Sequence, residues 1–237
     1  MMRKKRVVSS SRVRKFVESA VGEDLHAKRV LSLSQGTAGV IHAAALGVSA
    51  IGRGLALAEG LSSKHAIKQV DRLLSNTGVD VWALFAAWVP YMLGGRTEVV
   101  VALDWTDFDA DDQATLALHM MTSHGRATPL MWKTVRKSEL GGNRNRVEDD
   151  LLIHLRSVVP KDVKVTVVAD RGFGDAELYA LMWELGFDYV IRFRAVIRVT
   201  DSNGETKPAG EWVPETGRPK MLRDALVTGR KTPIPAV

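Results

Sequence analysis

The order of strand-like and helical patterns between residues 98 and 193 constrains the fold more than any other feature of this chain. The strand-like runs cover 98–103, 115–121, 128–135, 163–169 and 188–193, and the helical patterns cover 147–158 and 175–185. Only short polar turns separate the first three runs, which predicts three consecutive antiparallel strands. The predicted order is β-β-β-α-β-α-β, an α/β arrangement.

Two of these strand-like runs stop on an aspartate. VVVALDWTDFD contains Asp104, and VTVVADRGFGD contains Asp170. A strand that returns to its sheet through a helix normally makes a right-handed crossover and lies parallel to its neighbour. If the second run lands beside the first, both aspartates lie together at the carboxyl ends of parallel strands, where open sheets place their sites.

Paired carboxylates at such a position predict a metal site. Two close carboxylates repel each other, and a hard divalent cation such as Mg²⁺ or Mn²⁺ relieves the repulsion. A pair of these ions activates a water or hydroxyl nucleophile and stabilises the leaving oxygen of a phosphodiester. For either aspartate taken alone, an ordinary turn residue is the alternative interpretation.

Arginines flank the proposed metal site. They are Arg171, Arg192 and Arg194. Arg192 and Arg194 alternate with Ile191 and Phe193, so the two arginines are expected on one face. Arginine binds phosphate in a bidentate way, which favours DNA backbone contacts, with a solvated sheet edge as the alternative.

The N-terminal part of the chain has a different character. The pattern is helical from about Val13 to Leu93, and residues 1–30 hold nine Lys/Arg against three Asp/Glu. We expect a basic N-terminal arm over 1–30 and an all-α DNA-binding region over 31–94. The charge asymmetry suits a polyanionic partner such as nucleic acid, and a solvated arm is the open alternative.

The clearest helix of this region is LSSKHAIKQVDRLLSNTG. Ser62 or Ser63 is expected to cap its start. Its apolar face is expected to hold Ala66, Ile67, Val70, Leu73 and Leu74. Lys64, Lys68 and Arg72 recur at every fourth position on another strip, where they would present donors to phosphates or base edges. An ordinary solvated helix face is the alternative.

Composition excludes several classes of protein. The chain has no cysteine, which rules out disulfides, thiolate metal sites and a thiol nucleophile and favours a reducing cytoplasm. The longest apolar stretch, Thr37 to Ala58, carries His42 and Arg53 and is a poor membrane span. We expect no membrane partner and no targeting segment.

ALDWTDFD, VVADRGFGD and YVIRFR resemble the catalytic core of DDE transposases of bacterial insertion sequences, in the broad IS-four group that includes the Tn-five type. The resemblance includes the SSKHAIKQVDRLLSN helix and spans about residues 25–195. It implies an RNase H-like, retroviral-integrase-like mixed sheet over 95–195. It also implies that Asp104 and Asp170 are the first two acids of the DDE triad and bind Mg²⁺ or Mn²⁺.

The same resemblance implies a substrate and a reaction. The substrate is double-stranded DNA at transposon ends and at the target. The reaction is hydrolytic nicking at the element end, followed by strand transfer from the freed 3′-hydroxyl. The family also implies a homodimer for the full-length protein and a cytoplasmic, nucleoid-associated location in a bacterium.

The third acid of the triad departs from the family pattern. The family carries it as the glutamate of a Tyr-x2-Arg-x3-Glu-x6-Lys signature, in a helix usually beyond a β-rich insertion. Tyr189 and Arg192 match the start of that spacing by accident, because Val196 and Asn203 stand at the Glu and Lys positions. Residues 196–237 suit the opening of a β-rich insertion, with a hairpin turn at 202–204. Pro214 argues against a helix holding both late glutamates, Glu211 and Glu215.

We therefore expect an incomplete RNase H-like core and a transposase whose reading frame stops early, so that the chain has little or no activity alone. Two alternatives stay open. One is a non-catalytic DNA-binding fragment that regulates transposition, for which the helical region and basic arm suffice. The other is a compact two-carboxylate nuclease, which requires the chain to be complete.

Overall fold

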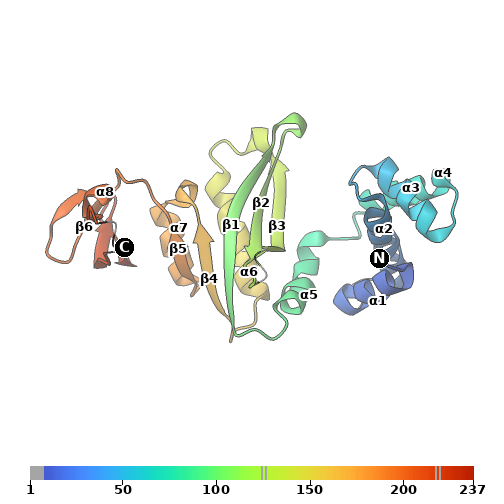
Figure 1. Cartoon of the computed structure of the whole chain (residues 1–237), viewed down its shortest axis with the longest axis horizontal. Coiled ribbons are helices and arrows are strands. Elements are labelled where there is room, and N and C mark those ends of the chain that lie inside the picture. Colours follow the sequence, from blue (N-terminus) through green and yellow to red (C-terminus); the bar gives the residue numbers. More distant parts are fainter. Residues whose placement is uncertain (1–7, 124, 126, 217, 219) are drawn as a thin grey trace, which may run out of the picture. The chain divides into compact units, whose positions relative to one another are not determined.

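The computed structural model describes residues 8–123, 125, 127–216, 218 and 220–237. The chain divides into two compact units, residues 1–91 and 92–237, close to the boundary expected after residue 94. The chain is mixed α/β: its first unit contains helices, and its second contains two sheets (Figure 1). Residues 1–7 of the expected basic arm lie outside the described residues.

The first unit is built from helices, as the periodicity predicts. They are α1 (Ser10–Val21), α2 (Ala27–Ala43), α3 (Val48–Glu59), α4 (Ser63–Leu74) and α5 (Val81–Leu93). No single helix in the described part of the chain is long and apolar enough to cross a membrane. Together α2 and α3 pass that test, but they bend by 97° at the break between them.

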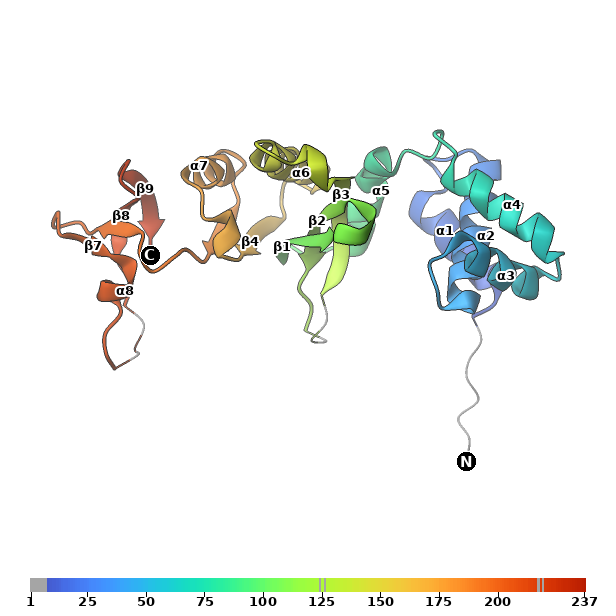
Figure 2. The ribbon, with the colours of Figure 1, turned by 90° about the horizontal axis from the view of Figure 1, so that it is seen from above.

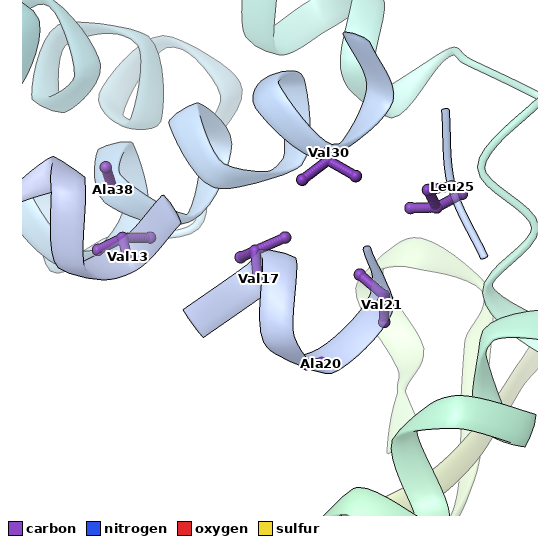
Figure 3. Packing of buried hydrophobic residues seen from close by; sticks show 7 residues of the cluster. All are labelled: Val13, Val17, Ala20, Val21, Leu25, Val30 and Ala38. Carbon is purple, nitrogen blue, oxygen red and sulfur yellow. The ribbon is translucent and has the colours of Figure 1, made fainter. Parts of the chain in front are cut away.

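The expectation of a separate arm over residues 1–30 is wrong for residues 8–30. Helix α1 buries Val13, Val17, Ala20 and Val21 against Leu25 and α2, where Val30 and Ala38 complete the cluster shown in Figure 3. These apolar residues of α1 recur at helical spacing between its basic ones, so they form one continuous stripe. Burial of that stripe makes α1 part of the helical core.

Helices α2, α3 and α4 approach each other through glycines. A methyl group at Gly52 of α3 would lie 2.5 Å from Cα and 2.8 Å from the backbone nitrogen of Ile67 in α4. A methyl group at Gly54 would meet the Gly39 carbonyl oxygen of α2 closer than any normal contact. Only residues without a side chain fit at these crossings, so the glycines set how closely α3 packs on both neighbours.

The larger sheet confirms the predicted order of elements. Its strands are β1 (Glu98–Phe108), β2 (Gln113–Met120), β3 (Thr128–Arg136), β4 (Lys164–Ala169) and β5 (Asp188–Ile191), in the spatial order β3-β2-β1-β4-β5. The first three strands pair antiparallel, whereas β4 pairs parallel with β1 and with β5. Helices α6 (Arg144–Val158) and α7 (Ala176–Glu184) make the two crossovers.

The two faces of this sheet differ in burial. Helices α6 and α7 lie on the same side of it (Figure 2). Alternate residues of β1 and β4 are buried, including Val101, Leu103 and Val167, and Leu151 and Leu155 of α6 are fully buried. On the opposite face, Val100 and Val190 keep 42% and 61% of their surface exposed. We call this opposite side the open face.

The described residues between 196 and 237 include a small antiparallel sheet. It contains β6 (Arg198–Thr200), β7 (Thr206–Pro208), β8 (Arg223–Val227) and β9 (Thr232–Ala236), in the order β7-β6-β8-β9. The predicted hairpin turn joins β6 to β7. The buried core of the small sheet includes Val199 and Trp212. The four-residue helix α8 (Ala209–Trp212) contains Glu211 and ends before Pro214, so Glu211 and Glu215 do not share a helix.

Candidate active site

The register between β1 and β4 brings the two aspartate-bearing segments together. The parallel pairing runs from Glu98 opposite Lys164 to Leu103 opposite Ala169. Asp104 is the residue after Leu103, and Asp170 is the residue after Ala169. Asp104, within β1, and Asp170, directly after β4, therefore take neighbouring positions on adjacent parallel strands, as predicted.

Both aspartates belong to the open face. Side chains alternate along a strand, so Asp104 follows Val100 and Ala102 on that face, while the buried Val101 and Leu103 point toward the helices. The backbone of Asp170 is still extended, with φ −81° and ψ −179°, which continues the alternation of β4 by one residue. Both carboxylates are solvent-exposed.

The expectation that Asp104 lies at the end of its strand is wrong. Strand β1 continues to Phe108 because β2 keeps supplying antiparallel partners, from Ala117 opposite Asp104 to Gln113 opposite Phe108. Asp104 is instead the residue at which β1 leaves β4. The parallel neighbour ends there, which gives the aspartate an open side next to Asp170.

Arg192 extends this row onto a third strand. In the pairing of β4 with β5, Ala169 lies opposite Ile191, and the Arg192 amide donates to the Ala169 carbonyl at 3.2 Å. Arg192 therefore follows Ile191 as Asp170 follows Ala169. Across the whole sheet the row reads Trp132, Ala117, Asp104, Asp170 and Arg192. It places one basic and two acidic residues at neighbouring register positions on one face.

The other predicted arginines also lie near this end of the sheet. Arg194 comes two residues after Arg192 and is exposed like it, while Ile191 and Phe193 pack against the core of the small sheet. The predicted alternation of the two arginines is confirmed. Arg171 begins the 3₁₀ turn Arg171–Phe173, directly after Asp170, and is exposed.

The Arg-Gly-Phe-Gly corner has a physical reason. One carboxylate oxygen of Asp170, Oδ1, accepts a hydrogen bond from the Gly172 amide at 2.7 Å. The aspartate therefore caps the turn that reverses the chain after β4. Within the part of the chain that the structure describes, no hydrogen bond reaches its Oδ2.

Sequence reasoning missed a polar network behind the row. The Trp105 indole Nε1 donates to Glu148 Oε1 of α6 at 2.7 Å, and the Arg144 guanidinium lies 3.7 Å from the same oxygen. The Arg144 guanidinium also covers the Trp105 ring, 4.8 Å from its centre. Glu148 is only 6% exposed. Burial raises the pKa of Glu148 above its usual range, while the Trp105 hydrogen bond and the charge of Arg144 oppose the rise.

A signal for Glu148 was present in the sequence. Glu148 precedes Leu151 and Leu152 by three and four residues, so it falls on the apolar stripe of its helix. A charged residue at such a position is rarely buried without partners. The sequence does not reveal that Trp105, on a strand over forty residues earlier, is one of them.

Asp104 and Asp170 have the right chemistry to bind a divalent cation. Exposed aspartate oxygens are the hard ligands that Mg²⁺ and Mn²⁺ prefer. Among the residues that the structure describes, no group of three or more His, Asp or Glu side chains is arranged to hold a metal ion. Val196 lies in a turn after β5 with its side chain exposed.

Helix α4 carries the predicted cationic strip. Ser62 caps it by accepting from the His65 amide at 3.4 Å. Lys64, Lys68 and Arg72 are all exposed, and Ala66 and Val70 are buried. The expectation that Leu74 belongs to the apolar face is wrong, since 63% of its surface is exposed. Leu74 is the last residue of α4, where the packed part of the helix ends.

Comparison with known proteins adds no relative. The chain matches no protein-family model, and no curated protein matches it significantly.

Proposed function

We propose that this chain is a DDE-type transposase component that acts on the phosphodiester bonds of double-stranded DNA with Mg²⁺ or Mn²⁺. The observation that carries the proposal is the row of Asp104, Asp170 and Arg192 on one face of three adjacent parallel strands. The order of the sheet, β3-β2-β1-β4-β5 with helices α6 and α7 as crossovers, suits an RNase H-like core. The resemblance of the sequence to bacterial insertion-sequence transposases agrees with both.

In this proposal each residue has a distinct role. Asp104 and Asp170 hold the cation, which when bound polarises a phosphoryl oxygen and lowers the pKa of a bound water. Arg192, Arg171 and Arg194 bind the phosphates on either side of the scissile one. Lys64, Lys68 and Arg72 of α4 hold the flanking duplex by its backbone. The setting is the bacterial cytoplasm, at the nucleoid, with a homodimer as the assembly of the full-length protein.

The proposal includes weak metal binding and little cleavage by this chain alone. Two aspartates supply a metal site with two acid ligands, whereas the family's triad supplies three. A charge clamp loses much of its effect when one of its groups is absent. Addition of a helix that carries the family's glutamate should therefore create Mg²⁺-dependent nicking of transposon ends.

Mn²⁺ binding to the purified chain tests the proposal most directly. We expect calorimetry to detect Mn²⁺ binding that Asp104→Asn and Asp170→Asn each abolish. Asp162→Asn is the matched control, because Asp162 is an exposed acid in the loop before β4. Equal Mn²⁺ binding by the wild type and both site variants would contradict the proposed site. Strong DNA cleavage by the unmodified chain, lost in Asp170→Asn, would favour the compact nuclease instead.

A second candidate function is regulation of transposition through DNA binding alone. It is favoured by the first unit, which has its own buried core and exposes the cationic strip of α4. Duplex binding that persists in Asp104→Asn, in a chain that binds no Mn²⁺, would support this candidate over the catalytic one.

A further inference from the structure

We infer that the first turns of α6 position both aspartates, with Glu148 acting on Asp104 through Trp105 and Asn145 acting on Asp170 through Asp175. The inference deepens the proposed function and rests on its assignment of the two aspartates. In this arrangement Glu148 and Asn145 are positioning residues that contact neither metal nor DNA.

The first connection fixes β1 where it loses its parallel neighbour. After Leu103 the strand pairs only with β2. Trp105 points away from the open face, and its indole is held by Glu148 and covered by Arg144. Asp104 and Trp105 share one peptide unit and point to opposite faces. The Trp105 anchor therefore limits rotation of the backbone that carries Asp104.

The second connection fixes the corner after β4. Asp175 Oδ1 accepts from the Glu177 amide at 3.0 Å and so caps α7, while Asp175 Oδ2 accepts from the Asn145 side-chain amide. At the other end of the corner, Asp170 accepts from Gly172. The corner is thus held at its start by Asp170 and at its end by α6.

The two anchors come from one place on α6. Asn145 and Glu148 are three residues apart, so they lie on the same side of the helix about one turn from each other. Any shift of this part of α6 moves both connections together. One rigid element therefore sets the relative position of two chain segments that meet in the row.

General stability does not account for this network. Another ion pair, Lys133 with Asp150 at 2.9 Å, already joins α6 to β3. A buried acid is costly unless it is paired, and a well-packed apolar residue often replaces such a group without loss of stability. An apolar residue cannot accept a hydrogen bond, whereas Glu148 accepts one from Trp105, the residue after Asp104.

Carboxyl-carbon NMR of the full-length chain tests the inference without any need for activity. Glu148→Ala should move the Asp104 carboxyl resonance, and Glu148→Gln should restore it, because the amide oxygen still accepts from Trp105. Asn145→Ala should move the Asp170 resonance more than the Asp104 resonance. Asp150→Asn is the matched control, since it removes an ion pair of α6 with β3, which lies two strands away from Asp104.

The outcomes separate the inference from the proposed function. If Glu148→Ala and Asn145→Ala move the two resonances no more than Asp150→Asn does, the inference is wrong. If Glu148→Ala fails to fold, Trp105→Phe breaks the same hydrogen bond from the other side. Mn²⁺ added to the wild type should broaden both aspartate resonances. Absence of broadening would contradict the proposed metal site. The resonance shifts in Glu148→Ala and Asn145→Ala would still test the positioning role.

Discussion

Substitution of Gly52 by alanine is a direct test of how α3 packs on α4. The new methyl group would lie 2.5 Å from both Cα and Cγ1 of Ile67, and 2.8 Å from its backbone nitrogen. Ordinary contact begins at 3.4 Å, so the two helices must separate by about 0.9 Å at this point. The Ile67 side chain can rotate away, but its backbone cannot. Helix α4 as a whole has to move.

The cost follows from two opposing effects. Overpacking of a close contact typically costs about 1–3 kcal/mol, and a clash with backbone belongs at the upper end. Alanine gains about 1 kcal/mol over glycine inside a helix. We expect a net loss of about 2 kcal/mol. For a unit of this size each kcal/mol lowers Tm by roughly 4–8 °C, so the melting temperature of the helical unit should fall by about 8–16 °C.

Thermal unfolding of the full chain measures this loss, with calorimetry to separate the two units and circular dichroism at 222 nm to follow the helices. Arg53→Ala is the control, because residue 53 is the exposed neighbour of Gly52 in α3. A surface change of this kind should stay within about 0.5 kcal/mol. If Gly52→Ala melts at or above the wild-type temperature, α3 and α4 are not in contact through this glycine.

Two further predictions concern charge. Burial raises the folded-state pKa of Glu148 above its ordinary value. Below the ordinary glutamate pKa the carboxyl is neutral in both folded and unfolded states and costs no stability, whereas above the raised pKa its buried charge lowers the free energy of unfolding. Glu148→Gln removes this charge, so its stability relative to the wild type should increase as the pH rises from the ordinary to the raised pKa. Urea unfolding at a series of pH values measures the difference, and a constant difference would contradict a raised pKa. Removal of three phosphate contacts by Lys64→Ala, Lys68→Ala and Arg72→Ala together should reduce the slope of log K against log salt by about 2.7 for duplex DNA. Lys161→Ala, at an exposed loop residue, should leave the salt slope unchanged, and an unchanged slope in the triple variant would mean that α4 does not contact DNA.

The sequence predicts much of the larger sheet because its local patterns agree with its topology. Buried valines at alternate positions identify β1 and β4, and the helix between them requires a parallel return. Once β4 is assumed to lie beside β1, those two facts place Asp104 next to Asp170. The cap of α4, expected at Ser62 or Ser63 and found at Ser62, and the turn between β6 and β7 depend on local chemistry, and the sequence predicts both.

The features that were missed depend on partners far away in the chain. Residues 104–108 look like a polar turn, and they continue β1 only because β2 pairs with them. Residues 10–21 look like part of a charged arm, and they fold because α2 covers their apolar stripe. Glu148 becomes a buried acid through Trp105 of another element. In each case tertiary contacts outweigh the local pattern.

The alternation of β1 and β4 also limits how this region tolerates insertions and deletions. Loss of one residue between Val101 and Asp104 would turn Asp104 toward α6 and α7 while the valines before it kept their places. Loss of two residues would return Asp104 to the open face, but two positions out of register with Asp170. Point substitutions leave this count unchanged. Whether the number of residues between the buried valines and Asp104 is odd or even therefore decides which face the aspartate occupies. Composition and hydrophobicity do not measure this number.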